Sequence, residues 1–192
     1  MRAETTINTK VREIRKLNIE DSILKGKLIF KEGYLDKINR LTVYIFFSPL
    51  IILPVLMILN QNFENANDAF LLYTIFPISI FTGLYIFYRN ASEKSLIKIE
   101  TKFSKEDTRK LLLDHAESKG YEIYRKSGDC IILNEKSSDF NESYKRSSII
   151  FIQDYEVSFS VIKDGFRLNL PVLFSHLMLK RDLAKLFKSA GT

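Results

Sequence analysis

Two long segments of the chain contain no charged residue, and each has the length of a membrane-spanning helix. They cover residues 41–59 and 69–88, and all 29 basic and 23 acidic side chains lie outside them. At about 1.5 Å per residue, the shorter segment extends roughly 28 Å, close to the ~30 Å hydrocarbon core of a bilayer. Only the Asn-rich residues 60–68 separate the two segments. This pattern predicts two transmembrane helices joined as a hairpin over residues 41–88.

Helices buried in the core of a soluble protein are the alternative explanation of the two segments. Such helices normally keep a polar face, which neither segment has. The remaining chain also offers only one small domain, of about 90 residues, which is too little protein to cover both helices. Membrane spanning is therefore the favoured interpretation.

Three prolines interrupt the predicted spans. Each removes one backbone donor, so Pro49, Pro54 and Pro77 predict kinks where other groups satisfy the freed carbonyls. Gly83 lacks a second glycine at the four-residue spacing of a helix dimerisation motif, so the sequence predicts no particular pairing of the helices. Aromatic residues near the corresponding ends of the two segments fit an interfacial belt: Tyr44, Phe46, Phe47, Tyr85, Phe87 and Tyr88.

Residues after the second segment have the periodicity of a small α+β domain with an antiparallel sheet and two helices. Ser104 has the position of a helix N-cap and Gly120 that of a helix stop. Strict alternation over 155–163 predicts a half-buried antiparallel strand. The core expected beneath the two helices comprises Tyr155, Val157, Phe159, Val161, Leu168 and Leu170. The expected elements are a helix between Ser104 and Gly120, strands over 121–126, 130–135, 147–153, 155–163 and 166–170, and a final helix from about 172 to 188.

Two segments are open between alternatives. Residues 89–103, a juxtamembrane linker, can extend the second membrane helix or form a first strand. Within residues 1–40, Val11, Ile14 and Leu17 suggest a short amphipathic helix that lies on the membrane or packs on the open face of the sheet, and residues 27–34 can add an edge strand. Packing is favoured because a small domain gains core from it. The predicted organisation is a basic arm over 1–40, the hairpin over 41–88, the linker over 89–103 and the α+β domain over 104–192.

The distribution of basic residues predicts the orientation of the hairpin. Lys and Arg together number ten in residues 1–40, none in 60–68 and nineteen in 89–192. The positive-inside rule then places both termini and the α+β domain in the cytosol, as in a multi-pass protein of a cell inner membrane. Near an anionic leaflet, four of these groups are candidate contacts to the headgroups of membrane lipids. They are Lys37, Arg40, Arg89 and Lys94, for which a role in topology alone is the simpler interpretation.

The sequence contains no recognisable catalytic, metal or cofactor motif. Cys130 is alone, which excludes an intrachain disulfide and a thiolate metal cluster, and His115 and His176 have no motif around them. The net charge of +6 and the pI of about 9.3 follow the membrane flanks, so nucleic-acid binding is not expected. Transport by two helices without ionisable groups is not expected either. No cofactor is expected, and a non-enzymatic role is favoured.

The order of the predicted elements resembles that of a known group of proteins. The stretch from Leu111 through Gly120, Tyr121, Glu122 and Ile123, and the predicted hairpin over 148–161, follow the membrane segments and the basic N-terminal arm. This layout resembles uncharacterised bacterial inner-membrane proteins, notably from Bacteroidetes-like lineages. The resemblance covers the architecture and no motif. It implies a two-span membrane protein with a small cytosolic domain, and it carries over no functional residue.

Two functional hypotheses follow. The first is a non-enzymatic adaptor whose α+β domain binds a partner protein or another copy of the chain, or serves as a subunit of a membrane assembly; an immunity protein against a membrane-targeted toxin belongs to this class. Its docking surface would be the polar face of the sheet. The second is a protein, or an enzyme, that handles lipid headgroups at the cytosolic membrane surface. The residues of the polar sheet face are Glu156, Ser158, Ser160, Arg167 and Asn169.

Overall fold

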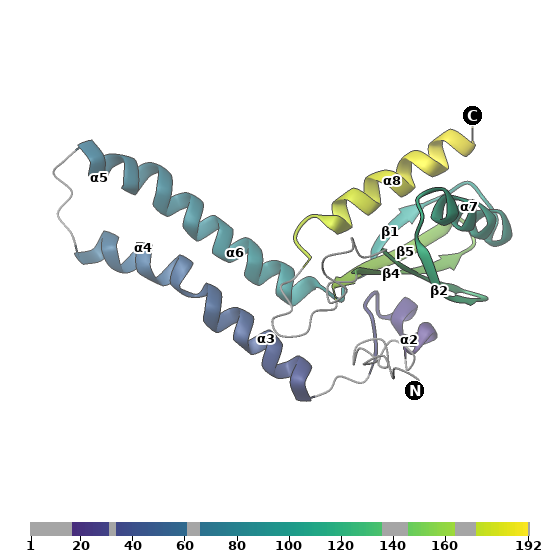
Figure 1. Cartoon of the computed structure of the whole chain (residues 1–192), viewed down its shortest axis with the longest axis horizontal. Helices are drawn as coiled ribbons and strands as arrows, with labels where there is room; N and C mark the ends of the chain where they lie inside the picture. Colours follow the sequence, from purple (N-terminus) through teal and green to yellow (C-terminus); the bar gives the residue numbers. More distant parts are fainter. Residues whose placement is uncertain (1–16, 31–33, 61–65, 136–145, 164–171, 192) are drawn as a thin grey trace, which may run out of the picture.

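The protein consists of a long helical hairpin and an α+β sheet domain that meet at the base of the hairpin (Figure 1). The computed structural model describes residues 17–30, 34–60, 66–135, 146–163 and 172–191. In these residues the C-terminal part has the antiparallel sheet and the two helices expected from the sequence. The α+β class is therefore confirmed.

Five strands form the sheet in the part of the chain that the structure describes, in the order β1-β5-β4-β3-β2, and all neighbours are antiparallel. Four of these strands match predicted ones, and the predicted strand over 166–170 lies outside the described residues. The fifth, β1, lies in the linker, because the second apolar helix ends at Ser92 and a strand follows it. The bounds are β1 Ile97–Glu100, β2 Glu122–Ser127, β3 Cys130–Asn134, β4 Arg146–Gln153 and β5 Glu156–Lys163.

Helices α7 (Lys105–Ser118) and α8 (Ser175–Ala190) cover one face of the sheet. Ser104 caps α7 by accepting a hydrogen bond from the Asp107 amide, and Gly120 has a φ of +70°, as a helix stop requires. Both predicted helix signals are confirmed. The main core lies between these helices and the sheet and includes Leu112, Ala116, Ile150, Val157, Phe159, Val161, Leu179, Leu183 and Phe187.

Tyr155 does not belong to this core, although the alternation of the sequence placed it there. It is 63% exposed and has a φ of +62°. Tyr155 lies in the two-residue turn that joins β4 to β5, where the side chain no longer points along the face of the sheet. The alternating pattern of apolar and polar residues therefore begins one residue before β5 itself. Leu168 and Leu170, also expected in the core, lie outside the described residues.

Residues 17–30 of the N-terminal arm pack on the opposite face of the sheet, the placement that the sequence favours for the arm. Helix α2 (Ile19–Leu24) and the residues on either side of it bring Leu17 and Leu28 against apolar side chains of the central strands. Lys27 also forms an antiparallel bridge with Ser95, at the start of the β1 edge. Val11 and Ile14 lie outside the described residues. The sheet side chains under the arm are Cys130, Ile132, Ile149, Phe151 and Ile162.

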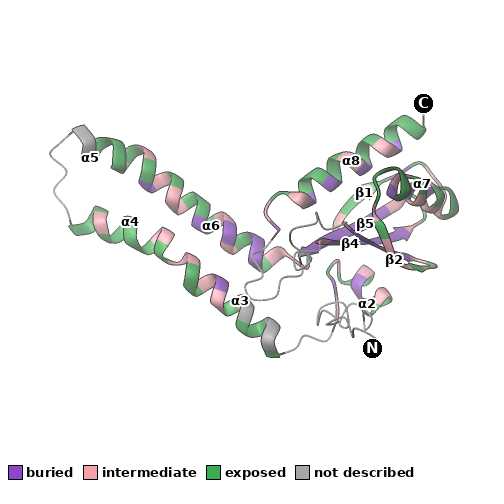
Figure 2. Ribbon diagram, viewed as in Figure 1, coloured by how far each residue is buried: buried purple, intermediate pink, exposed green. Residues whose placement is uncertain are grey.

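The hairpin has two helices that are long and apolar enough to cross a membrane, over Arg40–Asn60 and Asp68–Ser92. In the most apolar 18 residues of each helix, only 11% and 17% of the residues are buried within the protein. Figure 2 shows this contrast, with a largely exposed hairpin beside a buried sheet. The helical segments are α3 Tyr34–Phe47, α4 Pro49–Asn60, α5 Ala66–Phe70, a π-helical turn Leu71–Ile75, and α6 Phe76–Ser92.

Serine hydroxyls replace the backbone donors that two prolines remove from the first span. In a regular helix the amide of residue 49 would bond to the Ile45 carbonyl, and that of residue 54 to the Leu50 carbonyl. The Ser48 hydroxyl instead donates to the Ile45 carbonyl at 2.9 Å, and the Ser79 hydroxyl of α6 donates to the Leu50 carbonyl at 2.8 Å. The second bond joins the two helices.

Gly83 lies one turn beyond Ser79 and lets the helices approach closely. A Cβ atom on Gly83 would lie 2.7 Å from Cγ1 of Ile51, which is too short for a van der Waals contact. Ser79 and Gly83 therefore form a pair of small residues at four-residue spacing, the pattern of tightly packed membrane helices. The sequence does specify how the hairpin pairs, through a serine and a glycine rather than two glycines.

The Ser79 bond predicts an energetic coupling between the two helices. Ser79→Ala should destabilise the detergent-solubilised protein by about 1 kcal/mol, because the Leu50 carbonyl loses its donor. In a Pro54→Ala background the same change should have a smaller effect, because the alanine restores the backbone amide that proline lacks. Thermal unfolding of the four proteins of this double-mutant cycle measures the coupling.

Thr82→Ala is the matched control for this cycle, because the Thr82 hydroxyl bonds to the Ile78 carbonyl of its own helix. It should show no coupling to Pro54. Equal effects of Ser79→Ala in both backgrounds would show that the bond to Leu50 does not compensate for Pro54.

Candidate functional site

Hydrogen bonds from the end of α6 hold the segment that precedes α8. The Tyr85 hydroxyl donates to the Leu173 carbonyl at 2.7 Å, and Nε of Arg89 donates to the Val172 carbonyl at 3.1 Å. Arg89 is buried, and its guanidinium also donates to the Ser92 hydroxyl at 3.3 Å. We call the Tyr85 and Arg89 bonds to residues 172–173 the clasp. It connects the hairpin directly to the sheet domain.

Further hydrogen bonds at the base of the hairpin hold α3 and the linker in place. The Asn90 side-chain amide donates to the Arg40 carbonyl at 3.3 Å, which ties α6 to α3. The Ser160 hydroxyl of β5 donates to the Glu93 carbonyl at 2.8 Å. Tyr44 and Phe87 also meet edge to face, with ring centroids 5.0 Å apart. These contacts join the base of α6 to α3, and they join the linker that follows α6 to the sheet.

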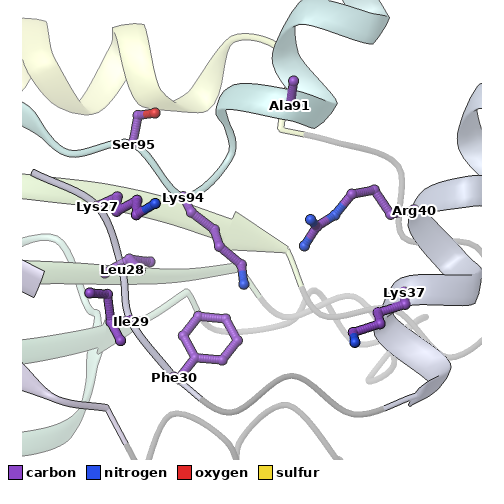
Figure 3. Close-up of a pocket in the computed structure, with 9 residues that line it drawn as sticks. All are labelled: Lys27, Leu28, Ile29, Phe30, Lys37, Arg40, Ala91, Lys94 and Ser95. Atoms are coloured by element: carbon purple, nitrogen blue, oxygen red, sulfur yellow. The ribbon is translucent and has the colours of Figure 1, made fainter. Parts of the chain in front are cut away.

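A pocket of about 520 Å³ lies between the N-terminal arm and the base of the hairpin. Gly26, with a φ of +62°, reverses the chain after α2, and the Leu28 amide then donates to the Lys94 carbonyl at 2.8 Å. This pairing brings two segments that are far apart in sequence to one side of the pocket, while α3 forms the other side (Figure 3). The lining residues are Lys27, Leu28, Ile29, Phe30, Lys37, Arg40, Ala91, Lys94 and Ser95.

The charge of this basic pocket is its main chemical property. Four of the nine lining residues are cationic, and none of these nine described residues is acidic. Figure 3 shows Arg40, Lys37 and Lys94 extending toward the same space. The Lys94 ammonium lies 4.2 Å from the centre of the Phe30 ring, which holds its long side chain in place. Several cations converging from separate segments form a site suited to an anion with several oxygen acceptors.

Three of the four residues expected to contact lipid headgroups line this pocket: Lys37, Arg40 and Lys94. Arg89 does not, because its guanidinium turns inward to the clasp and is 7% exposed. Lys27 was missed. It lies in the N-terminal arm, 67 positions from Lys94 in the chain, and only the fold brings the two together.

The polar face of β5 is not an exposed docking surface. Ser158 and Ser160 are buried, at 1% and 3% exposure, because the linker and the N-terminal arm cover that side of the sheet. Ser160 bonds to the Glu93 carbonyl, and Ser158 donates to Glu156, which is paired with Lys98 at 2.9 Å. Arg167 and Asn169 lie outside the described residues.

Cys130 and His176 are buried, and His115 is half-buried. Burial raises the pKa of the Cys130 thiol to about 11, and Cys130 packs under the N-terminal arm. Desolvation lowers the pKa of both histidines, and nearby Arg89 lowers that of His176 further. Among the described residues, no group of three His, Cys, Asp or Glu side chains is placed to hold a metal ion.

Comparison with protein-family models, with curated proteins and with solved structures finds no match for this chain. The site is therefore interpreted from its own geometry.

The lowered histidine pKa values predict a loss of stability on mild acidification. The folded protein favours neutral His115 and His176, whereas the unfolded chain takes up protons near the ordinary pKa of about 6.5. The free energy of unfolding should therefore be greatest above that pH and decrease as the pH falls toward about 5.5. A positive charge on His176 would also lie beside the Arg89 guanidinium.

Denaturant unfolding at a series of pH values, compared with a His115→Gln, His176→Gln double variant, checks this prediction. The variant should show a flatter dependence between about pH 7 and 5.5. An unchanged slope would assign the acid sensitivity to other groups.

Proposed function

We propose that this chain is a two-span membrane protein that binds a phosphate-bearing anion, in the form of a lipid headgroup, in the basic pocket beside its hairpin. The observation that carries the proposal is the position of the pocket. Arg40 is the first residue of one apolar helix, and Ala91 is next to the last residue of the other. If the hairpin spans the bilayer, the pocket lies at the depth of the headgroups.

The exposure of the hairpin supports membrane insertion. A core helix of a soluble protein is mostly buried, whereas only 11% and 17% of the residues in the most apolar windows of these helices are buried. Soluble proteins rarely expose contiguous apolar patches larger than a few hundred Å². Hydrocarbon is the solvent in which this surface is stable. The exposed residues include Leu41, Ile45, Phe46, Leu53, Leu56, Leu59, Phe70, Tyr73, Ile78, Phe81 and Leu84.

The basic flanks support the proposed orientation, with both termini and the sheet domain in the cytosol. Basic residues are absent from 60–68 and abundant on both outer flanks. This side of an inner membrane carries the anionic surface that attracts Lys and Arg. The pocket would therefore face its ligand in the leaflet where that ligand is found.

The composition of the pocket favours recognition over catalysis. Arginine forms paired hydrogen bonds to phosphate oxygens, and lysines add mobile positive charges. A volume of about 520 Å³ is within the range of small-molecule sites, and the half-buried side chains of Ile29 and Phe30 can contact the glycerol and upper acyl region. The nine described lining residues include no histidine, cysteine or carboxylate to act as a base or nucleophile. The adaptor hypothesis loses its proposed surface, since Ser158 and Ser160 are covered.

Cysteine labelling tests the orientation. Asn60→Cys places a thiol at the exposed end of α4, and Glu117→Cys places one on the exposed side of α7. A membrane-impermeant maleimide added to intact cells should label only position 60, and both positions after the membrane is opened. Cys130 should give little background, because its thiol is buried with a pKa of about 11. Labelling of position 117 alone in intact cells would reverse the orientation, and labelling of both would contradict the two-span hairpin.

Removing two pocket charges should weaken the binding of anionic lipid. Lys27→Gln with Lys94→Gln leaves Lys37, Arg40 and Arg89 in place near the membrane. Each lost charge near the headgroup layer corresponds to about 1 kcal/mol, so the apparent affinity for phosphatidic acid should fall about 30-fold. The measurement is the rise in melting temperature of the detergent-solubilised protein as phosphatidic acid is added, with phosphatidylcholine as the neutral lipid.

The matched control is Lys110→Gln with Lys126→Gln, which removes two exposed charges outside the pocket. It should respond to phosphatidic acid like the wild type. A shift produced equally by inorganic phosphate would assign the pocket to a soluble phosphate ligand in place of a lipid. If the pocket variant and the control respond alike, the pocket is not the anion site.

A further inference from the structure

The outward side of α8 differs from that of an ordinary surface helix. Its inward side contributes Leu179, Leu183 and Phe187 to the core. Its outward side begins with three large apolar side chains, Phe174, Leu177 and Met178, which are 61%, 51% and 64% exposed. Every charged residue at the exposed positions that follow is basic, and those positions are Lys180, Arg181, Ala184, Lys185, Lys188, Ser189 and Ala190.

The apolar end of this surface is continuous with the hairpin. Phe174, immediately before α8, stacks on Tyr85 of α6 with ring centroids 5.8 Å apart, and the clasp holds residues 172–173 to the same helix. Tyr85 belongs to the second apolar helix, which ends at Ser92. From this contact α8 extends away from the hairpin at the level where the hairpin meets the sheet domain (Figure 1).

We infer that the outward side of α8 lies on the anionic lipid surface of the membrane that the hairpin spans. The inference rests on the proposed membrane insertion and adds a second, peripheral contact to it. Apolar side chains on the first two turns would enter the boundary between headgroups and acyl chains, and the basic side chains farther along would contact anionic headgroups. This combination of apolar and basic residues is the pattern of helices that lie in a bilayer interface.

The charge pattern favours lipid over a second copy of the chain. Two copies facing each other through this side would bring the cations of both helices together, because the one carboxylate of α8, Asp182, is half-buried and does not belong to the exposed positions. An anionic leaflet supplies that neutralisation. The α8 surface is therefore assigned to the bilayer, and self-association becomes an outcome that the experiment detects.

A single tryptophan tests the contact, because the chain has no Trp of its own. Met178→Trp places the probe on α8, and Tyr155→Trp is the matched control, since the two native side chains are 64% and 63% exposed and Tyr155 lies in the β4–β5 turn. Each full-length variant is placed in nanodiscs of phosphatidylcholine and phosphatidylglycerol, with one protein per disc and brominated phosphatidylcholine as the quencher. The probe at position 178 should emit at shorter wavelength and be quenched several-fold more than the probe at position 155.

Neutralising Arg181 and Lys185 with glutamine in the Met178→Trp protein should reduce the quenching, as should discs without phosphatidylglycerol. Equal and weak quenching at positions 178 and 155 would overturn the inference. So would a blue shift at 178 that appears only in discs holding two copies, since a second chain would then cover the helix. Neither result would affect the labelling of positions 60 and 117, so a failure here is distinguishable from a failure of membrane insertion.

Discussion

The buried guanidinium of Arg89 is the interaction on which the rest of the arrangement depends. A charged group removed from water needs hydrogen-bond partners, and Arg89 donates from Nε to the Val172 carbonyl and from Nη1 to the Ser92 hydroxyl. The bond to Val172 fixes where α8 begins relative to α6, and Tyr85 reinforces it through the Leu173 carbonyl. Because α8 packs on the sheet, these bonds connect the hairpin to the sheet domain. The basic pocket needs this connection, since its walls come from α3, from the end of α6 and from the arm that packs on the sheet.

Within the hairpin, the same requirement for satisfied polar groups determines how the helices pair. Hydrocarbon offers no partner for a carbonyl that a proline has left without a donor. Ser48 satisfies one such carbonyl within the first span, and Ser79 satisfies another from the second span, at the level where Gly83 allows the backbones to approach. Pro54 therefore frees the Leu50 carbonyl, through which Ser79 joins the two helices. Under the proposed membrane insertion, a hairpin so joined, with no Asp, Glu, Lys or Arg in its apolar segments, would anchor the chain and present the pocket at a fixed depth.

Much of the fold follows from local patterns in the sequence, whereas the site does not. Absence of charge marked both apolar helices, and the Ser104 and Gly120 signals marked the ends of α7, because each depends on neighbouring residues alone. The alternation of apolar and polar residues distinguishes the two faces of β5. No pattern among neighbouring residues shows that the arm and the linker cover Ser158 and Ser160. The sequence also does not show which way the Arg89 side chain points, because a basic residue at the end of a span can turn toward lipid or toward protein. Lys27 and Lys94 meet through a reversal at Gly26 that no pairwise pattern reveals. The Ser79 and Gly83 spacing was a usable signal that a search for glycine pairs alone overlooks.

We propose that the hairpin and the sheet domain form one body at the bilayer surface. Electron-electron double resonance between spin labels at Asn60→Cys and Glu117→Cys, in the full-length protein in nanodiscs, measures it directly, because the labels lie at the far end of α4 and on α7 of the domain. The native thiol of Cys130 is buried and should stay unlabelled. If the clasp holds, the distance distribution is a single narrow peak, and Arg89→Ala broadens it. A broad distribution in the wild-type protein would mean that the domain moves freely on a flexible linker, and this would contradict the account.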